Sequence, residues 1–380
     1  MSNFIPFGKP IINDDELNSV NEVLKSGILV HGKFTHDFET EFAQRNGSKH
    51  AIALSSCTAG MHLGLFISGI GRGAKVAVPA MTHVATAHVV ELQGAQPVFI
   101  DVDPQTGNMS IEKLREASRL FNLDAIIPVH YLGLPCDMDE INHIGRENNS
   151  LVIEDCALSL DAKYKGKKTG SLADLGSFSF YPVKHITSIE GGMVTTDNDE
   201  IATKIKKCRA FGYNKSLGER TRPGLYDVDS LGFNYRMNEV EAAVGLNQLK
   251  KIDEFIKFRS RNFKILNEKI SGIPGITTFP SEAKGSTSSF YCFNFVLPEN
   301  AEIKRNDLQD SLKELGIGTS IHYPSAVPLF EYYRKKYGYK SGDFPVSEWL
   351  AANTLSIGIA PHISEEDATY MANNIYNLLK

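Results

Sequence analysis

The chain has 380 residues, more than one hydrophobic core usually holds, so about two domains are expected. Hydrophobic residues make up 42% and charged residues 22%, which is typical of a soluble globular protein and argues against intrinsic disorder. The net charge of −5 creates no field that would favour nucleic acid or an anionic membrane, so neither is expected as a partner.

The five cysteines are scattered and lack the paired spacing of a zinc site or a disulfide framework, so no metal site is predicted. This pattern favours a reducing cytoplasm, and the N-terminus shows no basic start or apolar run of a signal peptide. The most membrane-like stretch, residues 51–70, is interrupted by polar residues and glycines, which favours a buried strand, turn and helix over a membrane span.

In chain order, short apolar strands alternate with helical patterns over the first half of the sequence. Strands are predicted at 51–54, 76–78, 97–101, 125–130 and 151–154, and helices at 61–67, 85–93, 111–121 and near 137–147. This alternation predicts an α/β domain with a mainly parallel sheet that is covered by helices on both faces.

The second half begins with a stretch of little periodicity, residues 211–229, which predicts a long excursion over the surface or toward a partner subunit. An apolar stripe from Val240 to Ile256 then predicts a long helix that leads into a second domain. Strands near 291–296 and 318–322 and helices near 305–315 and 365–379 give that domain an α+β character. We predict a large domain over 1–250, whose first 15 residues or so pack on the small domain, and a small domain over 251–380.

Polar or aromatic side chains follow four of the predicted parallel strands. Active sites of such sheets lie beyond the carboxyl ends of the strands, so these residues are expected to share a pocket. They are Ser55–Thr58, Pro79–His83, His130–Tyr131 and Asp155.

The pair of Lys184 and Asp155 carries most of the functional prediction. Lys184 lies in an apolar segment bounded by glycines, where its amine can form a Schiff base, and Asp155 ends an apolar strand, where a carboxylate can keep a pyridine nitrogen protonated. Together they indicate pyridoxal phosphate. The alternatives are an ordinary solvated lysine and an aspartate that only caps a helix.

The segment Ser55–Gly60 joins a strand to a helix, where free N–H groups and the helix dipole favour a phosphate. Ser179 could donate a hydroxyl to the same phosphate, and His83 could place its ring against the pyridine ring. Each of these residues has an ordinary structural reading as well, and the same holds for His130, His322 and Glu190.

Taken together, these residues resemble the DegT/DnrJ/EryC1/StrS family of sugar aminotransferases, which have the type I aspartate-aminotransferase fold. The resemblance extends in order over nearly the whole chain. The matching motifs are Lys25–Gly27 with Gly32, Ser56–Ala59, Val78–Thr86, Pro97–Asp103, Ile153–Asp155, Gly176–Lys184, Glu190–Met193, Leu231–Met237 and His322–Pro324.

The resemblance implies a role for each matching residue. Lys184 would be the Schiff-base lysine and Asp155 the partner of the pyridine nitrogen, and His83 would take the place of the stacking aromatic residue. Asn234 would reach the phosphate in the neighbouring subunit, so the resemblance implies a homodimer with shared active sites. The phosphate-binding residues would be Cys57, Thr58, Ala59 and Ser179, and a segment with His322 and Tyr323 would approach the substrate.

Two residues depart from the family pattern. Leu158 stands three residues after Asp155, where a polar residue is frequent, and Cys57 replaces the more frequent glycine before Thr58. The dehydratase branch of the family has histidine in place of the anchoring lysine, so the presence of Lys184 favours transamination over dehydration.

The expected reaction moves an amino group from L-glutamate to a nucleoside-diphosphate 4-keto-6-deoxyhexose, for surface polysaccharide or glycoconjugate synthesis such as that of O-antigen. Lys33, Arg220 and Arg222 are candidates to bind the diphosphate of this nucleotide-linked sugar, although solvated surface charge is the more common role of such residues. Amination of a 3-keto sugar at C3 is one alternative, and a non-catalytic regulatory protein of the same fold is another.

Overall fold

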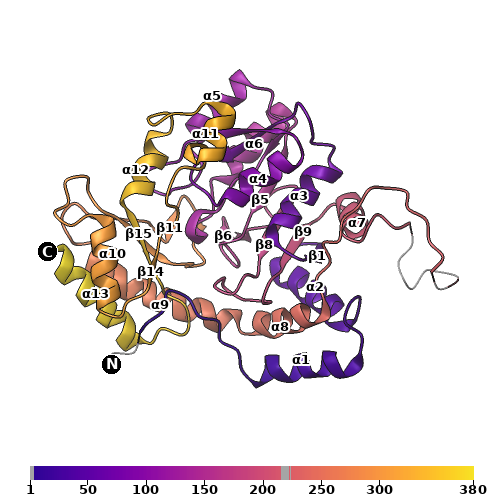
Figure 1. Cartoon of the computed structure of the whole chain (residues 1–380), viewed down its shortest axis with the longest axis horizontal. Coiled ribbons are helices and arrows are strands. Elements are labelled where there is room, and N and C mark those ends of the chain that lie inside the picture. The colour runs from indigo at the N-terminus through magenta and orange to yellow at the C-terminus, as the bar shows by residue number, and fades with distance from the viewer. Residues whose placement is uncertain (1–3, 215–221, 223) are drawn as a thin grey trace.

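The computed structural model describes residues 4–214, 222 and 224–380 (Figure 1). Helices surround a central sheet, and a second, smaller sheet lies at the side of the molecule where both termini are found. The helices are α1 Asp14–Ser26, α2 Lys33–Asn46, α3 Cys57–Ile67, α4 Val84–Leu92, α5 Ile111–Leu120, α6 Met138–Asn148, α7 Asp199–Cys208, α8 Glu239–Lys250, α9 Ile252–Ile270, α10 Arg305–Glu314, α11 Glu331–Tyr337, α12 Pro345–Asn353 and α13 Glu365–Leu379.

The central sheet has seven strands in the order β1-β9-β8-β5-β4-β2-β3. All neighbours pair in parallel except β9, which runs antiparallel to both β1 and β8. The strands are β1 His50–Leu54, β2 Lys75–Pro79, β3 Gln96–Ile100, β4 Ala125–Ile126, β5 Leu151–Asp155, β8 Leu175–Ser179 and β9 Gly192–Thr196.

The two faces of this sheet bury alternate side chains, as the period of two in a strand requires. Ile52 and Leu54 of β1 pack in one cluster with α3, α4 and α7. Ala51 and Ala53 of the same strand pack on the other side with α2 and α8, and α5 and α6 cover the rest of that face. The predicted α/β fold, with a mainly parallel sheet covered on both sides, is confirmed.

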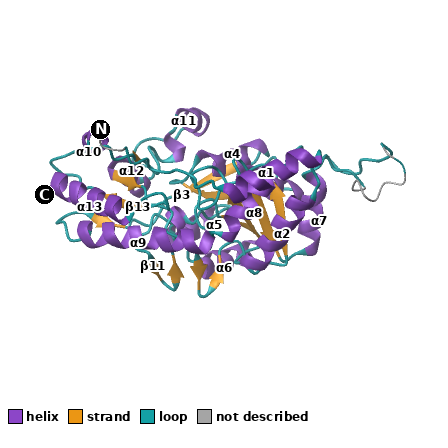
Figure 2. Cartoon of the chain, turned by 90° about the horizontal axis from the view of Figure 1, so that it is seen from below, coloured by secondary structure: helices purple, strands orange, loops and turns teal. Residues whose placement is uncertain are grey.

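A second core lies between α9, α10, α13 and an antiparallel sheet of order β10-β13-β15-β14. A third small sheet joins two hairpins, β6–β7 and β11–β12, and projects at the edge of the molecule in Figure 2. The strands are β10 Thr277–Thr278, β13 Phe293–Val296, β14 Thr319–Ser320, β15 Thr354–Ile357, β6 Lys163–Tyr164, β7 Lys167–Lys168, β11 Glu282–Ala283 and β12 Ser286–Thr287.

Segments from both parts of the chain pack on the core of the other predicted domain. Ile5 pairs with Ile317 and packs on the second core, whereas Val327, Tyr333 and Phe344 pack in the core of the central sheet. The division at residue 250 remains a prediction, because segments from each side of it pack on both cores.

Two predicted elements differ clearly from their predicted bounds. The stripe from Val240 to Ile256 forms two helices, α8 and α9, which are separated at Lys251. Strand β4 ends at Ile126 rather than residue 130, since Pro128 has no N–H group for the sheet and only a single bridge, Val129 to Asp155, follows. None of the helices in the described parts of the chain is long and apolar enough to cross a membrane.

The predicted excursion at 211–229 lies partly outside the described residues. Its two described flanks pair with each other, through Tyr213 with Val228 and through the Asn214 N–H, which donates to the Asp227 carbonyl at 3.0 Å. The described flanks extend away from the body of the molecule in Figure 1.

Candidate active site

A cavity of about 500 Å³ opens at the carboxyl ends of β1, β2, β5 and β8. This volume falls in the range of pockets for small molecules and cofactors. Residues that follow these strands line it together with three side chains from the C-terminal part, Tyr291, His322 and Tyr323. The four polar clusters of the sequence therefore converge only in part, because Asp155 and the residues after β1 and β2 line the cavity whereas His130 and Tyr131 do not.

Asp155 is the last residue of β5, and its buried carboxylate is held from two sides. Its Oδ1 accepts the Ala157 N–H at 3.0 Å, and its Oδ2 accepts the Thr86 hydroxyl at 2.9 Å. Two donors leave lone pairs free on both oxygens, so the carboxylate can still accept a further hydrogen bond from a group in the cavity.

Lys184 lies in the loop between β8 and β9, and its half-buried side chain lines the cavity. Its Nζ lies 5.2 Å from the centre of the Tyr291 ring. Burial of the amine lowers the pKa of Lys184 below its ordinary value, against the opposing attraction of Asp155. A lysine of lowered pKa carries more of the neutral, nucleophilic amine at a given pH.

The phosphate site that the sequence predicts falls at the first turn of α3. Ser56 caps this helix by accepting the Ala59 N–H at 3.0 Å, so that N–H is already occupied, and Ala59 is buried and does not line the cavity. Thr58 and Ser179 both line the cavity, and the first N–H groups of a helix have no helical acceptor. A side chain at Gly192 would lie 2.3–2.6 Å from the backbone of Ser56 and Cys57, so only glycine lets β9 approach this turn.

Cys57 is buried beneath the same turn and lines the cavity. Its Sγ donates to the Ser177 carbonyl at 3.3 Å and lies 3.9 Å from Asp155 Oδ1. Burial and the nearby Asp155 raise the pKa of Cys57 well above its ordinary value, so it stays a neutral thiol. The departure from glycine thus fits without disturbing the helix start.

The aromatic residues predicted near the cofactor ring and the substrate also line the cavity. His83 caps α4 by accepting the Ala85 N–H at 3.2 Å. The centres of the His83 and Tyr323 rings lie 6.1 Å apart in an edge-on arrangement. His322 is buried, and burial together with Lys184 and His83 lowers its pKa to about 3. His322 is therefore neutral at physiological pH.

Several cavity residues were not singled out by the sequence. Tyr291 lines the cavity and Thr86 touches Asp155 from α4, whereas Thr82, which also lines the cavity, belongs to the predicted cluster Pro79–His83. The spacing of Thr82 and Thr86 by four residues at a predicted helix start was an available signal, since such residues share one helix face. No local pattern marks Tyr291, which is brought in by the fold.

Three of the remaining predicted residues do not line the cavity. Asn234 is exposed on a segment that pairs with Ala210, and Lys33 is exposed at the start of α2, 3.7 Å from Asp37. Arg222 is exposed within the excursion, and the fourth residue, Arg220, lies outside the described residues. A single chain therefore brings the lysine, the aspartate and the residues at the helix start together. Of the other four residues, Asn234, Lys33 and Arg222 lie outside the cavity, and Arg220 is not described.

Leu158 is buried in the cavity wall beside Tyr131 and Tyr291, and it offers no polar group there. The wall on this side is apolar, which agrees with the burial that lowers the pKa of Lys184. No other described side chain is placed by the structure in the role of the missing polar residue.

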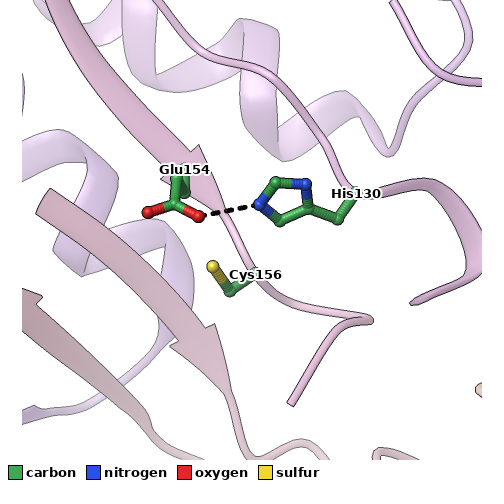
Figure 3. Close-up of side chains that lie close together, drawn as sticks. All are labelled: His130, Glu154 and Cys156. Carbon is green, nitrogen blue, oxygen red and sulfur yellow. Dashed lines mark hydrogen bonds and ion pairs between the residues drawn. The ribbon is translucent and has the colours of Figure 1, made fainter. Parts of the chain in front are cut away.

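His130, Glu154 and Cys156 form a compact buried group whose ligand-type atoms lie within 4.8 Å of one another (Figure 3). Their polar atoms already have protein partners. The Cys136 N–H donates to His130 Nδ1 at 3.1 Å, so Nε2 carries the hydrogen and donates to Glu154 at 3.0 Å. Glu154 also accepts three backbone N–H groups from residues 170–173. Through these hydrogen bonds, the group holds the loop before β8 in place.

The donor set of the cavity fits pyridoxal phosphate. An amine, an ionisable carboxylate with free lone pairs, and a helix start with a nearby hydroxyl are the three kinds of group that an aldehyde, a pyridine nitrogen and a phosphate require. Lys184, Asp155, and Thr58 with Ser179 supply these groups around one cavity.

Comparisons with known proteins agree with this chemistry. The uncharacterized protein MJ1066 of Methanocaldococcus jannaschii is 40% identical over 99% of this chain and 98% of its own. The spore coat polysaccharide biosynthesis protein SpsC of Bacillus subtilis is 35% identical over 100% and 98%. Among solved structures, Spr1654 of Streptococcus pneumoniae, described as a sugar aminotransferase in its PLP form, has 25% identity and a TM-score of 0.91 over 99% and 98%.

A model of one protein family matches residues 10–376, nearly the whole chain. The chain therefore belongs to the DegT/DnrJ/EryC1/StrS aminotransferase family, and it is a sugar aminotransferase that uses pyridoxal phosphate.

Proposed function

We propose that this enzyme takes its amino group from L-glutamate and delivers it to C4 of a nucleoside-diphosphate 4-keto-6-deoxyhexose, giving a 4-amino-4,6-dideoxyhexose nucleotide. The observation that carries the proposal is the convergence of Lys184 and Asp155 on one cavity beside the α3 helix start. Pyridoxal phosphate, when bound, supplies an aldehyde that takes up amino groups and a ring that withdraws electrons from the reacting carbon.

The chain's own residues supply positioning and proton transfer. The Lys184 amine anchors the cofactor between turnovers, and during turnover its Nζ takes a proton from the reacting carbon and returns it. Its lowered pKa keeps a useful fraction of the amine neutral. The Asp155 carboxylate holds the proton of the pyridine nitrogen in place. Tyr291 and Tyr323 bring apolar surface to the cavity and exclude water from it.

The similarity to SpsC, a spore coat polysaccharide biosynthesis protein, supports a product that enters a surface polysaccharide. Such pathways begin from cytoplasmic sugar nucleotides, so the enzyme is proposed to act in the cytoplasm. Amination at C3 of a 3-keto sugar remains the alternative within the same chemistry.

A homodimer with shared active sites is part of the proposal. Asn234 is exposed and does not line its own cavity, and exposed apolar residues lie on the same stretch of chain, including Leu225, Val228 and Leu231, which are 57%, 50% and 69% exposed. A second copy of the chain would bury this surface and bring Asn234 to the partner's phosphate seat. Lys33, Arg220 and Arg222 are then proposed to bind the substrate diphosphate.

The test combines spectroscopy with product analysis. Addition of L-glutamate to the loaded enzyme is expected to replace its visible absorption by that of the pyridoxamine phosphate form, while Lys184→Ala is expected to reduce kcat by about a thousandfold or more. Lys184→Arg serves as a control that keeps the positive charge without a transferable amine. Wild-type turnover in Lys184→Ala would refute the assigned role. NMR of products from 4-keto and 3-keto sugar nucleotides distinguishes C4 from C3 amination.

A further inference from the structure

Two threonine hydroxyls form a chain that ends on the Asp155 carboxylate. Thr86 Oγ1 lies 2.9 Å from Asp155 Oδ2, and Thr82 Oγ1 lies 2.9 Å from Thr86 Oγ1. Thr86 is 0% exposed, Thr82 1% and Asp155 4%, so water cannot compete for these hydrogen bonds.

The direction of the chain follows from the acceptor at its end. An ionised carboxylate can only accept, so the Thr86 hydroxyl hydrogen points at Asp155. That hydroxyl has no second hydrogen, so the one on Thr82 must point at Thr86. Both hydroxyl dipoles are therefore aligned toward the carboxylate, and each strengthens the other.

The ordinary role of a helical threonine does not explain this contact. Thr86 lies in the first turn of α4, where a threonine hydroxyl commonly bonds the carbonyl four residues earlier. Here the Thr86 hydroxyl donates instead to Asp155, the last residue of β5. Nothing in the packing of α4 requires a donor at this position, whereas the buried carboxylate does.

We propose that Thr86, backed by Thr82, is a positioning residue that fixes the orientation of the Asp155 carboxylate for the pyridine nitrogen. The inference rests on the role of Asp155 in the proposed function. The Ala157 N–H, two residues further along the chain, donates to Asp155 Oδ1. Thr86 donates to Oδ2 of the same carboxylate from a different element, α4.

The test uses Thr86→Val, which keeps the shape of the side chain and removes the hydroxyl. The dissociation constant of pyridoxal phosphate, from absorbance titration, is expected to rise about tenfold and kcat to fall about tenfold, with little change in KM for the sugar. Thr86→Ser should restore the cofactor affinity and kcat to within about twofold.

Thr354→Val is the matched control, because Thr354 is equally buried and its hydroxyl bonds the Leu350 carbonyl in the second domain. It should leave the cofactor affinity and kcat unchanged. Wild-type affinity and kcat in Thr86→Val, or a defect in Thr86→Ser as large as in Thr86→Val, would overturn the inference. If Thr86→Val does not fold, Thr86→Ala is titrated in its place with the same expected loss. A wild-type enzyme that binds no cofactor would instead refute the proposed function.

Discussion

Single residues in this molecule owe their chemistry to burial rather than to charge partners. The Lys184 amine lies in an apolar cavity that lowers its pKa, and Cys57 lies below the helix start as a neutral thiol. Both residues are ordinary in the sequence and unusual only in their surroundings.

His322 gives a prediction at this scale. Burial lowers its pKa to about 3, whereas an unfolded histidine titrates near 6.5, so the unfolded chain binds more protons between these values. Stability should therefore fall as the pH drops below about 6.5. Between pH 7.5 and pH 5, His322 should account for up to about 2 kcal/mol of lost stability.

Urea midpoints of the cofactor-free protein at both pH values measure this loss. His322→Asn keeps a donor for the Ser356 hydroxyl, which lies 3.0 Å from His322 Nδ1, and does not titrate. The midpoint of the variant should shift less with pH than that of the wild type. Equal shifts in the two proteins would show that His322 does not carry the effect.

The sequence could predict which residues meet at the site only where the strands themselves bring them together. Asp155, Thr58 and Ser179 follow or end parallel strands, so their meeting followed from the topology. Tyr291 reaches the cavity through the packing of the second domain against the first, which no local pattern reveals. The contact of Thr86 with Asp155 depends on a rotamer and an angle between a helix and a strand.

At the scale of elements, side chains at the break between α8 and α9 hold the N-terminal helix α1 in place. Lys251 lies at the break and its Nζ contacts Glu16 of α1 at 2.7 Å and the Asn13 side chain at 2.6 Å. Gln248 adds a hydrogen bond to Glu16 at 2.8 Å. Although burial opposes ionisation, hydrogen bonds led by Lys251 lower the pKa of Glu16 below its ordinary value.

The removal of this lysine should be costly. Lys251→Ala leaves the buried Glu16 carboxylate without its cation, and we expect a loss of about 3 kcal/mol, the lower end for broken buried pairs. Denaturant midpoints measure the change. In the wild type this contribution is present above the unfolded pKa of Glu16 and fades as the pH falls through the lowered one.

An exposed pair provides the control for this measurement. Lys113 and Glu116 on α5 lie 2.9 Å apart with both side chains about half exposed, so Lys113→Ala should not shift the midpoint measurably. A shift as small for Lys251→Ala would mean that Lys251 does not contribute measurably to holding α1.

Element types were more predictable than element ends. The apolar stripe of α8 and α9 continues through Lys251, so periodicity alone indicated one helix, and the break coincides with the bonds of Lys251 to α1. The early end of β4 was readable in principle, since Pro128 stands within the predicted strand.

For the whole molecule, the proposed dimer predicts complementation between two inactive variants. If Asn234 serves the partner's site, a mixed dimer of Lys184→Ala and Asn234→Ala contains one site with both wild-type residues. Random mixing makes half of the dimers mixed, each with one of two sites intact, so about a quarter of wild-type activity should return.

The measurement requires subunit exchange or co-expression, followed by an assay at equal total protein. The separate variants, assayed under the same conditions, provide the baseline. Activity of the mixture that merely equals the average of the two variants would place Asn234 outside the partner's site. The result is independent of which sugar the enzyme prefers.

The antiparallel strand β9 has a further consequence for how this scaffold can change. Ser179 and Gly192 are opposite each other in the ladder of β8 and β9, so the segment bearing the lysine starts and finishes at one point of the sheet. Within it, residues 185–188 are buried and Ile186 packs in a core cluster, whereas Ile189 is exposed and Glu190 lines the cavity, so only the last two positions can vary without disturbing the packing. Diversified libraries aimed at new acceptor sugars should begin there.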